Sequence, residues 1–210
     1  MKHEIGKLQF ITLAHENLSH SEQAIRAIRS GCRWVQLRMK ATDDATILAE
    51  AKRILAVAES HNAVLIINDR ADLALECGAQ GVHLGKSDMT VAEARKLLGE
   101  HKIIGATANT LDDIKALALQ KPDYIGLGPF RFTTTKKNLS PILGLDGYKS
   151  ILQAMKNQNT NIPVVAIGGI VADDVAEILS TGVHGIALAG AIVANETIEE
   201  NTKQYLEKLY

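Results

Sequence analysis

Residues 123–144 read DYIGLGPFRFTTTKKNLSPILG, and the unit that they open repeats along the chain. The apolar run from Tyr124 to Leu127 predicts a short β-strand, which Gly128-Pro129 ends. A polar loop follows, and residues 145–157 then predict a helix. The loop over 129–143 is long for a strand-to-helix connection, so we expect it to act as a lid.

Outward from this unit, seven further short apolar runs predict strands. Several are rich in β-branched residues and almost continuously apolar, which is typical of strands that are covered on both faces. The eight predicted strands are 8–13, 34–38, 63–68, 81–84, 103–107, 124–127, 163–167 and 185–189.

Helical patterns separate these strands. Thr90 with Glu93 predicts a capping box, and Thr110 with Asp113 predicts a weaker one. The predicted helices are 21–30, 43–61, 71–77, 90–98, 110–120, 145–157, 172–180 and 197–209.

Strand–helix alternation predicts a parallel sheet with right-handed crossovers. Eight units within 210 residues fit a single-domain α/β protein, a (β/α)8 TIM barrel over residues 1–210. An open doubly wound sheet is the alternative, but the first strand lacks the GxGxxG turn of dinucleotide-binding folds.

Composition restricts the partners and the compartment. A net charge of −1 argues against nucleic acid as a partner. The N-terminus has no signal-peptide pattern, and the longest strongly apolar stretch, 162–172, is too short to span a membrane. Cys32 and Cys77 have no metal-ligand spacing and fit a reduced protein. We therefore expect a cytoplasmic enzyme without a membrane partner; its oligomeric state is open, with a homo-oligomer as one alternative.

In a TIM barrel the carboxyl ends of the strands meet at the catalytic face, so the residues at each strand end deserve comparison. The second strand ends in Gln36-Leu37-Arg38-Met39-Lys40, which places Gln36, Arg38 and Lys40 on one face. Unpaired buried charges are costly, so this is not an ordinary core face. The alternative is a strand that frays into solvent after Gln36.

The third and fourth strands are followed by carboxylates. Asn68-Asp69 ends the third strand, and Asp88 follows the fourth. Each aspartate could cap the next helix, but neighbouring strands place both at the same rim. Two carboxylates beside a basic phosphate site suggest Mg²⁺, which binds a few carboxylates together with substrate phosphate oxygens. We expect His83, inside the fourth strand, to be structural.

Two further strand exits have the chemistry of anion sites. Thr133, Thr134, Thr135, Lys136 and Lys137 follow the sixth strand and combine hydroxyl and ammonium groups, although a solvated loop is the alternative. The seventh and eighth strands end near Gly169, Ala189 and Gly190, where TIM barrels commonly hold phosphate on backbone N–H groups. The rim therefore predicts a basic, metal-assisted site and a separate amide nest, for two phosphorylated substrates or one doubly phosphorylated substrate.

From about residue 10 to residue 192 the chain resembles the thiamine phosphate synthase family. The motifs that carry the resemblance are VQLRMK (35–40), INDRADLAL (67–75), GVHLGKSDM (81–89), GPFRFTTTKK (128–137), GLDG (144–147) and VVAIGGI (164–170). The resemblance implies a Mg²⁺-dependent transferase. Its small-molecule substrates would be 4-amino-2-methyl-5-hydroxymethylpyrimidine diphosphate and 4-methyl-5-hydroxyethylthiazole phosphate, and its products thiamine phosphate and pyrophosphate.

The resemblance also implies roles for individual residues. Gln36 would contact the aminopyrimidine, and Asp69 and Asp88 would ligate Mg²⁺. The thiazole phosphate side would be lined by Thr133 and Thr135, with Gly169, Ala189 and Gly190 around the phosphate itself. The diphosphate would be held by Arg38, Lys40, Asn68 and Lys136, with Thr107 nearby; Arg38, Lys40 and Lys136 would be the catalytic cations.

The chain departs from the family pattern at the rim. Lys86 stands where Gln is common, Thr107 replaces a common Ser, and Asn109 replaces a common His. Arg131-Phe132 replaces an aromatic residue followed by Pro, and Gly190 replaces a Ser. These departures leave the roles of Lys86, Asn109 and Arg131 open.

Two functional alternatives remain at this point. One is a thiazole tautomerase of the same fold, and the other is a non-catalytic sensor of a phosphorylated ligand. The cations, the carboxylates and the threonine-rich loop favour the coupling enzyme over both, because neither alternative needs a metal-assisted diphosphate site.

Overall fold

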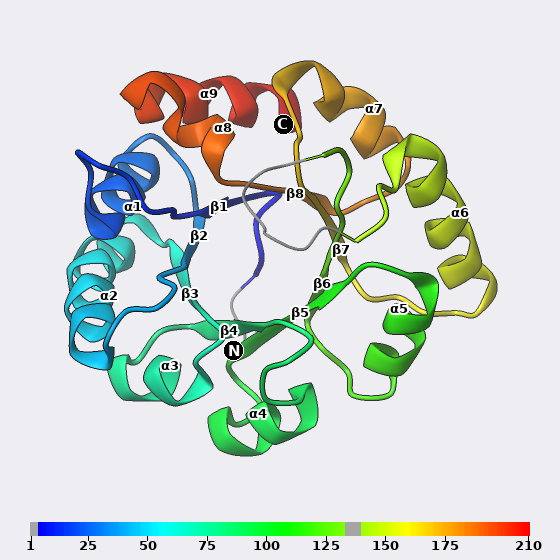
Figure 1. The fold of residues 1–210 in the computed structure, drawn as a ribbon, viewed down its shortest axis with the longest axis horizontal. Helices are drawn as coiled ribbons and strands as arrows, with labels where there is room; N and C mark the ends of the chain where they lie inside the picture. Colours follow the sequence, from blue (N-terminus) through cyan, green and yellow to red (C-terminus); the bar gives the residue numbers. More distant parts are fainter. Residues whose placement is uncertain (1–3, 133–139) are drawn as a thin grey trace.

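The computed structural model describes residues 4–132 and 140–210. Parallel strands hydrogen-bond to one another in chain order and close into a barrel, with Phe10 of the first strand opposite Leu188 of the last (Figure 1). The predicted TIM barrel is confirmed, and the open sheet is wrong. The strands are β1 (Leu8–Ile11), β2 (Trp34–Leu37), β3 (Val64–Asn68), β4 (Gly81–Leu84), β5 (Ile103–Ala108), β6 (Tyr124–Leu127), β7 (Val164–Ile167) and β8 (Gly185–Leu188).

Helices form an outer ring around the strands (Figure 1). Both predicted capping boxes are present, at Thr90–Glu93 and Thr110–Asp113. The helices are α1 (His20–Arg29), α2 (Asp44–Ala58), α3 (Ala71–Cys77), α4 (Val91–Leu98), α5 (Leu111–Ala118), α6 (Gly144–Asn157), α7 (Val175–Ser180), α8 (Gly190–Val193) and α9 (Ile198–Leu209).

The boundaries differ from the predictions where the chain tightens into 3₁₀ turns. The helix predicted over 43–61 ends as an α-helix at Ala58 and continues as a 3₁₀ turn, Glu59–His61, which stops at the left-handed Asn62. The helix predicted over 172–180 begins as a 3₁₀ turn, Ala172–Asp174. Helix α8 and the 3₁₀ turn Ala194–Glu196 were not predicted, because segments this short show no helical periodicity.

Aromatic side chains fill the barrel interior below the site. The rings of Trp34 and Tyr124 meet edge to face with centroids 4.7 Å apart. Gly105 makes room for them, because a Cβ there would lie 2.1 Å from Cζ of Tyr124. The buried Tyr124 hydroxyl accepts a hydrogen bond from Nε2 of Gln9 at 3.0 Å. The interior is therefore packed side chains and not a channel, as in other TIM barrels.

A second apolar layer joins the outer faces of the strands to the helices. Val35, Leu65 and Val82 are fully buried in this layer. Both cysteines are free thiols, Cys32 buried and Cys77 partly buried. Within the described ranges, no helix is long and apolar enough to cross a membrane.

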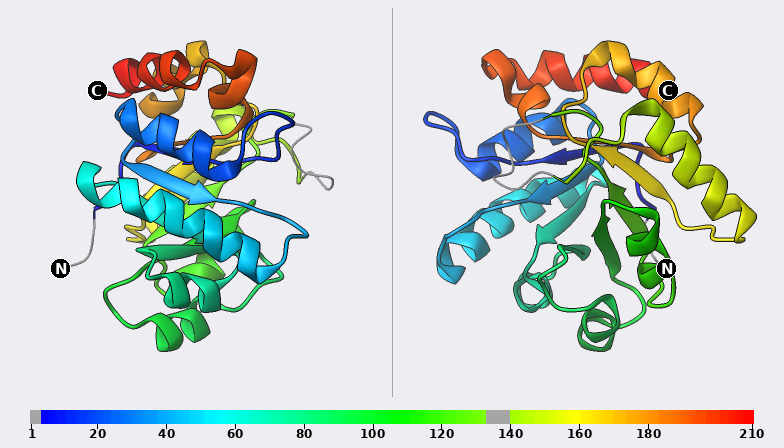
Figure 2. Two further views of the ribbon diagram at one scale, coloured as in Figure 1. Left: turned by 90° about the vertical axis from the view of Figure 1, so that its left-hand side faces the viewer. Right: turned by 45° about the vertical axis from the view of Figure 1, so that its right-hand side comes forward.

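Because all strands run parallel, their carboxyl ends share one rim. In the left view of Figure 2 the β2 arrow points toward the side that carries the loop after β1. The connections from each strand to the next helix lie on this side, and the predicted site residues belong to these connections.

Candidate active site

The structure brings the described candidate residues to the carboxyl rim of the barrel. Gln36, Asn68 and Thr107 lie in the last residues of β2, β3 and β5. Just beyond strand ends lie Arg38, Lys40, Asp69, Asp88, Gly169, Ala189 and Gly190. Thr133, Thr135 and Lys136, with Thr134, Lys137 and most of the predicted lid, lie outside the described residues.

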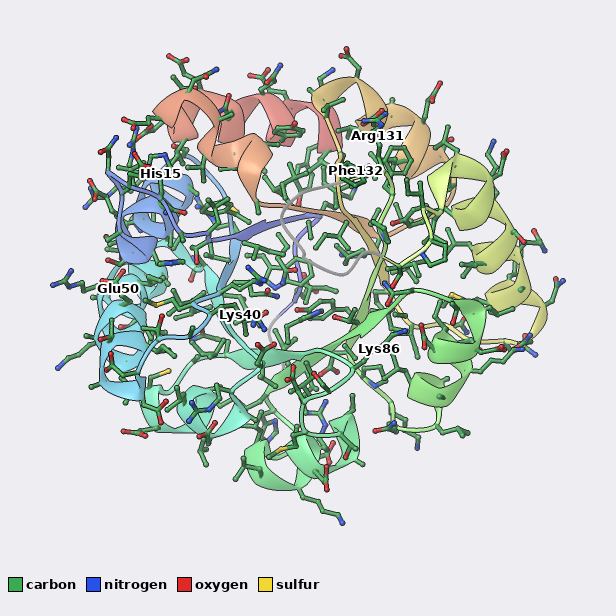
Figure 3. The ribbon with its side chains drawn as sticks, in the orientation of Figure 1. His15, Lys40, Glu50, Lys86, Arg131 and Phe132 are labelled. Atoms are coloured by element: carbon green, nitrogen blue, oxygen red, sulfur yellow. The ribbon has the colours of Figure 1, made fainter. Side chains whose placement is uncertain are left out.

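Lys40 and Asp69 connect the exits of β2 and β3. Nζ of Lys40 forms an ion pair with Oδ2 of Asp69. The Lys40 side chain is 56% exposed and the Asp69 side chain 22% exposed, so the ammonium remains open to a ligand while the carboxylate is held. Lys40 lies inside the ring of helices (Figure 3).

The backbone at Asp69 is strained. Its φ is +66°, and the N–H of Arg70 donates to the carbonyl of Asn68 at 2.8 Å, which closes a γ-turn around Asp69. Such turns are rare for residues other than glycine and concentrate at functional sites. The N–H of Asp69 still donates to the carbonyl of His83 at 2.8 Å, so the turn is anchored on β4. The strained turn directs the Asp69 carboxylate to the rim.

The side chain of Asp88 turns back to Gly85, just after the end of β4, and lies beside Asp69. Oδ2 of Asp88 accepts a hydrogen bond from the N–H of Gly85 at 2.6 Å. Burial raises the pKa of Asp88, the neighbouring Asp69 carboxyl group raises it further, and the positive charge of Lys40 opposes this shift. Neither aspartate caps a helix, because Arg70 precedes α3 without a side-chain cap and Thr90 caps α4. The helix-cap alternative is therefore wrong for both.

This pair of carboxylates fits Mg²⁺ that is shared with a substrate. Among residues 4–132 and 140–210, no cluster of three or more His, Cys, Asp or Glu side chains could hold a metal alone. Mg²⁺ is usually bound by one or two carboxylates, with water and phosphate oxygens completing its shell. Burial is the largest cause of the raised pKa of Asp88 and the Asp69 carboxyl group adds to it, and a bound divalent cation would favour the ionised form of both carboxylates.

Two buried amide groups beside this cluster have unused donors. The Gln36 amide lies near the Tyr124 hydroxyl. Within the described chain, however, neither Nε2 of Gln36 nor Nδ2 of Asn68 has a hydrogen-bond partner of acceptable geometry. Buried polar groups are nearly always paired, so these two donors are suited to a bound molecule.

His83 is hydrogen-bonded through both ring nitrogens. Nδ1 lies 3.0 Å from the Tyr124 hydroxyl, and Nε2 lies 3.0 Å from Oγ1 of Thr107. These contacts agree with the predicted structural role. They also connect Thr107 at the rim to the aromatic interior.

Arg38 is supported by residues that the sequence reasoning missed. Oγ1 of Thr12, fully buried at the end of β1, accepts a hydrogen bond from the Arg38 N–H at 3.1 Å. The same hydroxyl lies 2.7 Å from Nδ1 of His20. Burial lowers the pKa of His20, Glu50 opposes the shift, and the Arg38 charge adds to it. In the sequence, Thr12 stands out only as a lone threonine at the end of a predicted strand, which is weak evidence for a functional role.

The residues whose roles were open each bridge neighbouring loops. Nζ of Lys86, after β4, lies 2.6 Å from Oδ2 of Asp113 in α5. Nδ2 of Asn109, after β5, donates to the carbonyl of Gly128, after β6. Arg131, in the next loop, binds Asp174 beyond β7. Figure 3 labels Lys86 and Arg131 over different parts of the rim.

The glycine-rich exits lie on another side of the barrel mouth. Gly169 follows β7 and Gly190 follows β8, and these strands are neighbours. The cations and carboxylates follow β2, β3 and β4, with β1 between the two groups. The rim thus has a charged side and a backbone-amide side, which suits two phosphorylated groups.

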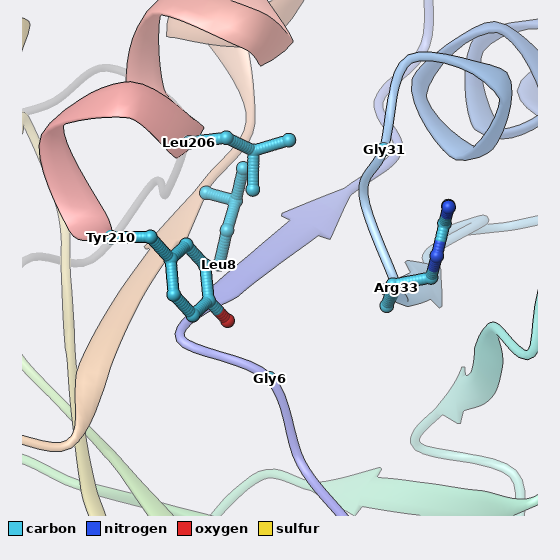
Figure 4. A pocket seen from close by; sticks show the side chains of 6 residues that line it. All are labelled: Gly6, Leu8, Gly31, Arg33, Leu206 and Tyr210. Carbon is cyan, nitrogen blue, oxygen red and sulfur yellow. The ribbon is translucent and has the colours of Figure 1, made fainter.

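A separate pocket lies at the opposite end of the barrel (Figure 4). It is formed where the start of β1 meets the C-terminal end of α9, and it contains none of the predicted site residues. Its lining residues are Gly6, Leu8, Gly31, Arg33, Leu206 and Tyr210.

The fold and this rim define a TIM-barrel enzyme that acts on phosphorylated small molecules. A family model described as thiamine monophosphate synthase matches residues 8–192, and the chain belongs to this family. It is thus a transferase, as the resemblance predicted, and the tautomerase and sensor alternatives are not favoured.

Individual relatives agree over almost the whole chain. A thiamine-phosphate synthase of Bacteroides fragilis is 52% identical over 199 residues, which cover 95% of this chain and 98% of that protein. A thiamine-phosphate synthase of Phocaeicola vulgatus is 48% identical and covers 98% of this chain and 99% of its own. The solved thiamine phosphate pyrophosphorylase of Pyrococcus furiosus superposes with a TM-score of 0.84 at 30% identity, covering 97% of this chain and 95% of that one.

Proposed function

We propose that the chain joins 4-amino-2-methyl-5-hydroxymethylpyrimidine diphosphate to 4-methyl-5-hydroxyethylthiazole phosphate, giving thiamine phosphate and pyrophosphate. The observation that carries this proposal is the cluster of Lys40, Asp69 and Asp88, beside two buried amides with unused donors. A diphosphate bound to this cluster would have the Asn68 amide as a further donor and would place the pyrimidine near Gln36. The Gly168-Gly169 turn and Gly190, elsewhere on the rim, are available to the phosphate of the second substrate.

The reaction exchanges one bond for another. The C–O bond between the pyrimidine methylene carbon and the diphosphate breaks, and its electron pair leaves with the diphosphate. The aminopyrimidine ring stabilises the resulting benzyl-like cation. The lone pair of the thiazole nitrogen then forms the new C–N bond. This route requires stabilisation of the leaving group and positioning of the thiazole, and no protein nucleophile.

The residues divide between these two tasks. Arg38 and Lys40 bind the diphosphate and neutralise the charge that develops as it leaves, and Lys136 has the same role. Asn68 and Thr107 donate hydrogen bonds at the same place, while Gln36 orients the aminopyrimidine. Thr133 and Thr135 line the thiazole side, and Gly169, Ala189 and Gly190 hold its phosphate. Remote binding of that phosphate orients the thiazole nitrogen.

Mg²⁺ fits the donors that Asp69 and Asp88 provide, and when bound it would supply charge stabilisation to the departing diphosphate. The strained turn at Asp69 keeps one carboxylate at the rim, and the Gly85 N–H fixes the other. Lys40 contacts Asp69, so its ammonium group would lie beside a diphosphate held at this place.

We place this reaction in the cytoplasm, where both thiols would remain reduced. Its partners are the two small-molecule substrates. No step of the proposed reaction requires a residue of a second chain, so the proposal holds for a monomer and for a homo-oligomer.

The test is pyrophosphate release by the pure protein with Mg²⁺ and the pyrimidine diphosphate, measured with and without the thiazole phosphate. Release that requires both substrates and the metal is expected. If no pyrophosphate forms while thiazole phosphate binds, the coupling reaction is wrong. A control with the unphosphorylated thiazole alcohol reports how much of the rate depends on the remote phosphate.

A further inference from the structure

The turn after β7 is pressed against the loop after β6. Gly168 and Gly169 have φ of +101° and +69°, both left-handed. A Cβ on Gly168 would lie 2.9 Å from Cα of Pro129, and one on Gly169 would lie 2.7 Å from the carbonyl oxygen of Phe132. Side chains are therefore excluded from both positions by conformation and by contact.

Arg131 binds both carbonyl groups of this turn. Its backbone N–H donates to the Gly168 carbonyl at 2.9 Å, and Nη1 of its guanidinium donates to the Gly169 carbonyl at 3.0 Å. Its guanidinium also makes a two-pronged contact with Asp174, with Nη1–Oδ2 at 2.9 Å and Nη2–Oδ1 at 2.7 Å.

Asp174 binds both Arg131 and the last residue of the turn, Val171. Oδ2 of Asp174 accepts a hydrogen bond from the N–H of Val171 at 2.8 Å, while the same carboxylate binds Arg131. Its side chain is only 13% exposed, so the carboxylate has little freedom to move. Arg131 and Asp174 thus fix the turn at Gly168, Gly169 and Val171.

These contacts determine where the remaining amides point. In a planar trans peptide the C=O and N–H groups point in opposite directions. Since the carbonyls of Gly168 and Gly169 both point to Arg131, the N–H groups of Gly169 and Ile170 point away from it. Neither N–H donates to an acceptor within residues 4–132 and 140–210. Two successive free amides of this kind form an anion-binding nest.

We propose that Arg131 and Asp174 are positioning residues, which hold the Gly168–Val171 turn in the shape that presents the Gly169 and Ile170 amides to the phosphate of the thiazole substrate. The inference rests on the proposed function for the identity of that ligand. In this proposal neither side chain touches the phosphate, because the Gly169 and Ile170 N–H groups point away from Arg131, and Arg131 and Val171 hold the Asp174 carboxylate. This also gives Arg131 the role that sequence comparison with the family left open.

The test compares Arg131→Met and Asp174→Asn with the unmodified protein. Calorimetric titration with 4-methyl-5-hydroxyethylthiazole phosphate measures phosphate-dependent binding, and titration with the unphosphorylated alcohol measures the rest. We expect each variant to weaken binding of the phosphate by about tenfold, the scale of one or two misplaced hydrogen bonds. Binding of the alcohol and the KM for the pyrimidine diphosphate should stay unchanged.

Arg26→Met is the matched control. Arg26 makes the same three-bond pattern elsewhere, with both oxygens of Glu199 at 2.6 Å and the Glu196 carbonyl at 2.9 Å. It joins α1 to α9 and does not touch the β7 turn, so its loss should leave thiazole phosphate affinity intact. The double variant of Arg131 and Asp174 should bind no more weakly than the weaker single variant, because the two side chains act as one unit.

The possible outcomes separate the two proposals. If the variants bind thiazole phosphate as tightly as the unmodified protein, the positioning role is wrong. If the unmodified protein does not bind thiazole phosphate, the proposed function fails first, and the ligand assignment fails with it. Should Arg131→Met fold poorly, Asp174→Asn and Arg131→Lys provide the same comparison, because each weakens the two-pronged contact while keeping a polar side chain.

Discussion

At the scale of single residues, Asp69 combines a strained backbone with a fixed carboxylate. Asparagine adopts positive φ more readily than most residues, so Asp69→Asn removes the charge without adding strain at φ +66°. We expect this variant, and likewise Asp88→Asn, to lower kcat by about 100-fold, the scale of losing one electrostatic stabiliser of a transition state. Both should also require more Mg²⁺ for half-maximal pyrophosphate release.

The control for this prediction is Asp112→Asn. Asp112 is an exposed carboxylate on α5 that pairs with Lys115 at 3.0 Å, away from the rim cluster. Its loss should change neither kcat nor the Mg²⁺ dependence. If both rim variants retain full turnover at low Mg²⁺, the two carboxylates are not metal ligands.

Gln36 and Gln23, two buried glutamines, differ sharply in their hydrogen bonding. Nε2 of Gln36 has no partner among the described residues, whereas Gln23 donates to the carbonyls of Leu13 and Leu18 and accepts from the Leu13 N–H. Gln36→Leu should leave the free energy of unfolding within about 1 kcal/mol and raise the KM for the pyrimidine diphosphate. Gln23→Leu should lower the free energy of unfolding by about 2–3 kcal/mol, because it leaves buried backbone groups of Leu13 and Leu18 without a hydrogen-bond partner.

Urea denaturation and steady-state kinetics on the two leucine variants check this prediction. A stability loss in Gln36→Leu as large as that in Gln23→Leu would mean that Gln36 is paired in solution. Its assignment to the substrate would then lose its support.

At the scale of elements, Lys86 ties the loop after β4 to the first turn of α5. Burial opposes ionisation of Asp113, but Lys86 and the N–H of Asn109, with Thr110, together lower its pKa below the ordinary 3.8. A carboxylate whose pKa is lower in the folded state stabilises the fold above its ordinary pKa. That contribution is lost as pH falls through the folded-state pKa.

Lys86→Met should therefore lower the free energy of unfolding by about 0.5–1 kcal/mol at pH 7, the scale of a partly exposed ion pair. The difference from the unmodified protein should shrink as pH falls from the ordinary pKa of Asp113 through its lower folded-state pKa, because the carboxylate is protonated first in the unfolded chain and then in the fold. Urea denaturation at pH 7 and at low pH measures it. Lys115→Met, on the exposed face of the same helix, is the control, and a difference that persisted at low pH would exclude the ion pair as its source.

The order of elements was predictable because each strand and helix has a local pattern. The capping boxes at Thr90 and Thr110 followed directly from residues three positions apart. Helix α8 was missed because four residues are too few for a period, and Gly190 gave no positive signal. A hydrophobic pattern predicts a helix or strand only when the element is long enough for several of its residues to face the same neighbour.

The shared location of the candidate site residues was predictable where polar residues follow strand ends, as at Lys40, Asp69 and Asp88, and their roles stay predictions. It was not predictable where residues from distant segments meet. Lys86 with Asp113 and Arg131 with Asp174 are 27 and 43 positions apart, and no local pattern connects the two members of either pair; Asp113 is predicted only as part of a helix cap. Their pairing depends on which loops become neighbours when the barrel closes.

At the scale of the whole molecule, closure of the barrel places a layer of packed interior side chains directly below the candidate site. Tyr124 belongs to the aromatic layer through Trp34, and its hydroxyl is shared by Gln9 and His83. His83 in turn holds Oγ1 of Thr107 at the rim. One hydrogen-bonded chain therefore connects β1, β4, β5 and β6 from the interior to the rim, and we expect stability and turnover to be coupled through it.

Tyr124→Phe tests this coupling, because it removes one oxygen and leaves the ring in place. The buried Gln9 amide would lose its acceptor, which should lower the free energy of unfolding by about 2 kcal/mol. His83 and Thr107 would lose their anchor, which should lower kcat by about tenfold through misplacement of the rim hydroxyl.

Tyr148→Phe is the matched control, since its buried hydroxyl donates to the Leu127 carbonyl in the outer layer. Urea denaturation and pyrophosphate release measured on both variants should show a stability loss in each but a loss of turnover only in Tyr124→Phe. Equal turnover in the two variants would mean that the interior supports the fold without orienting the site.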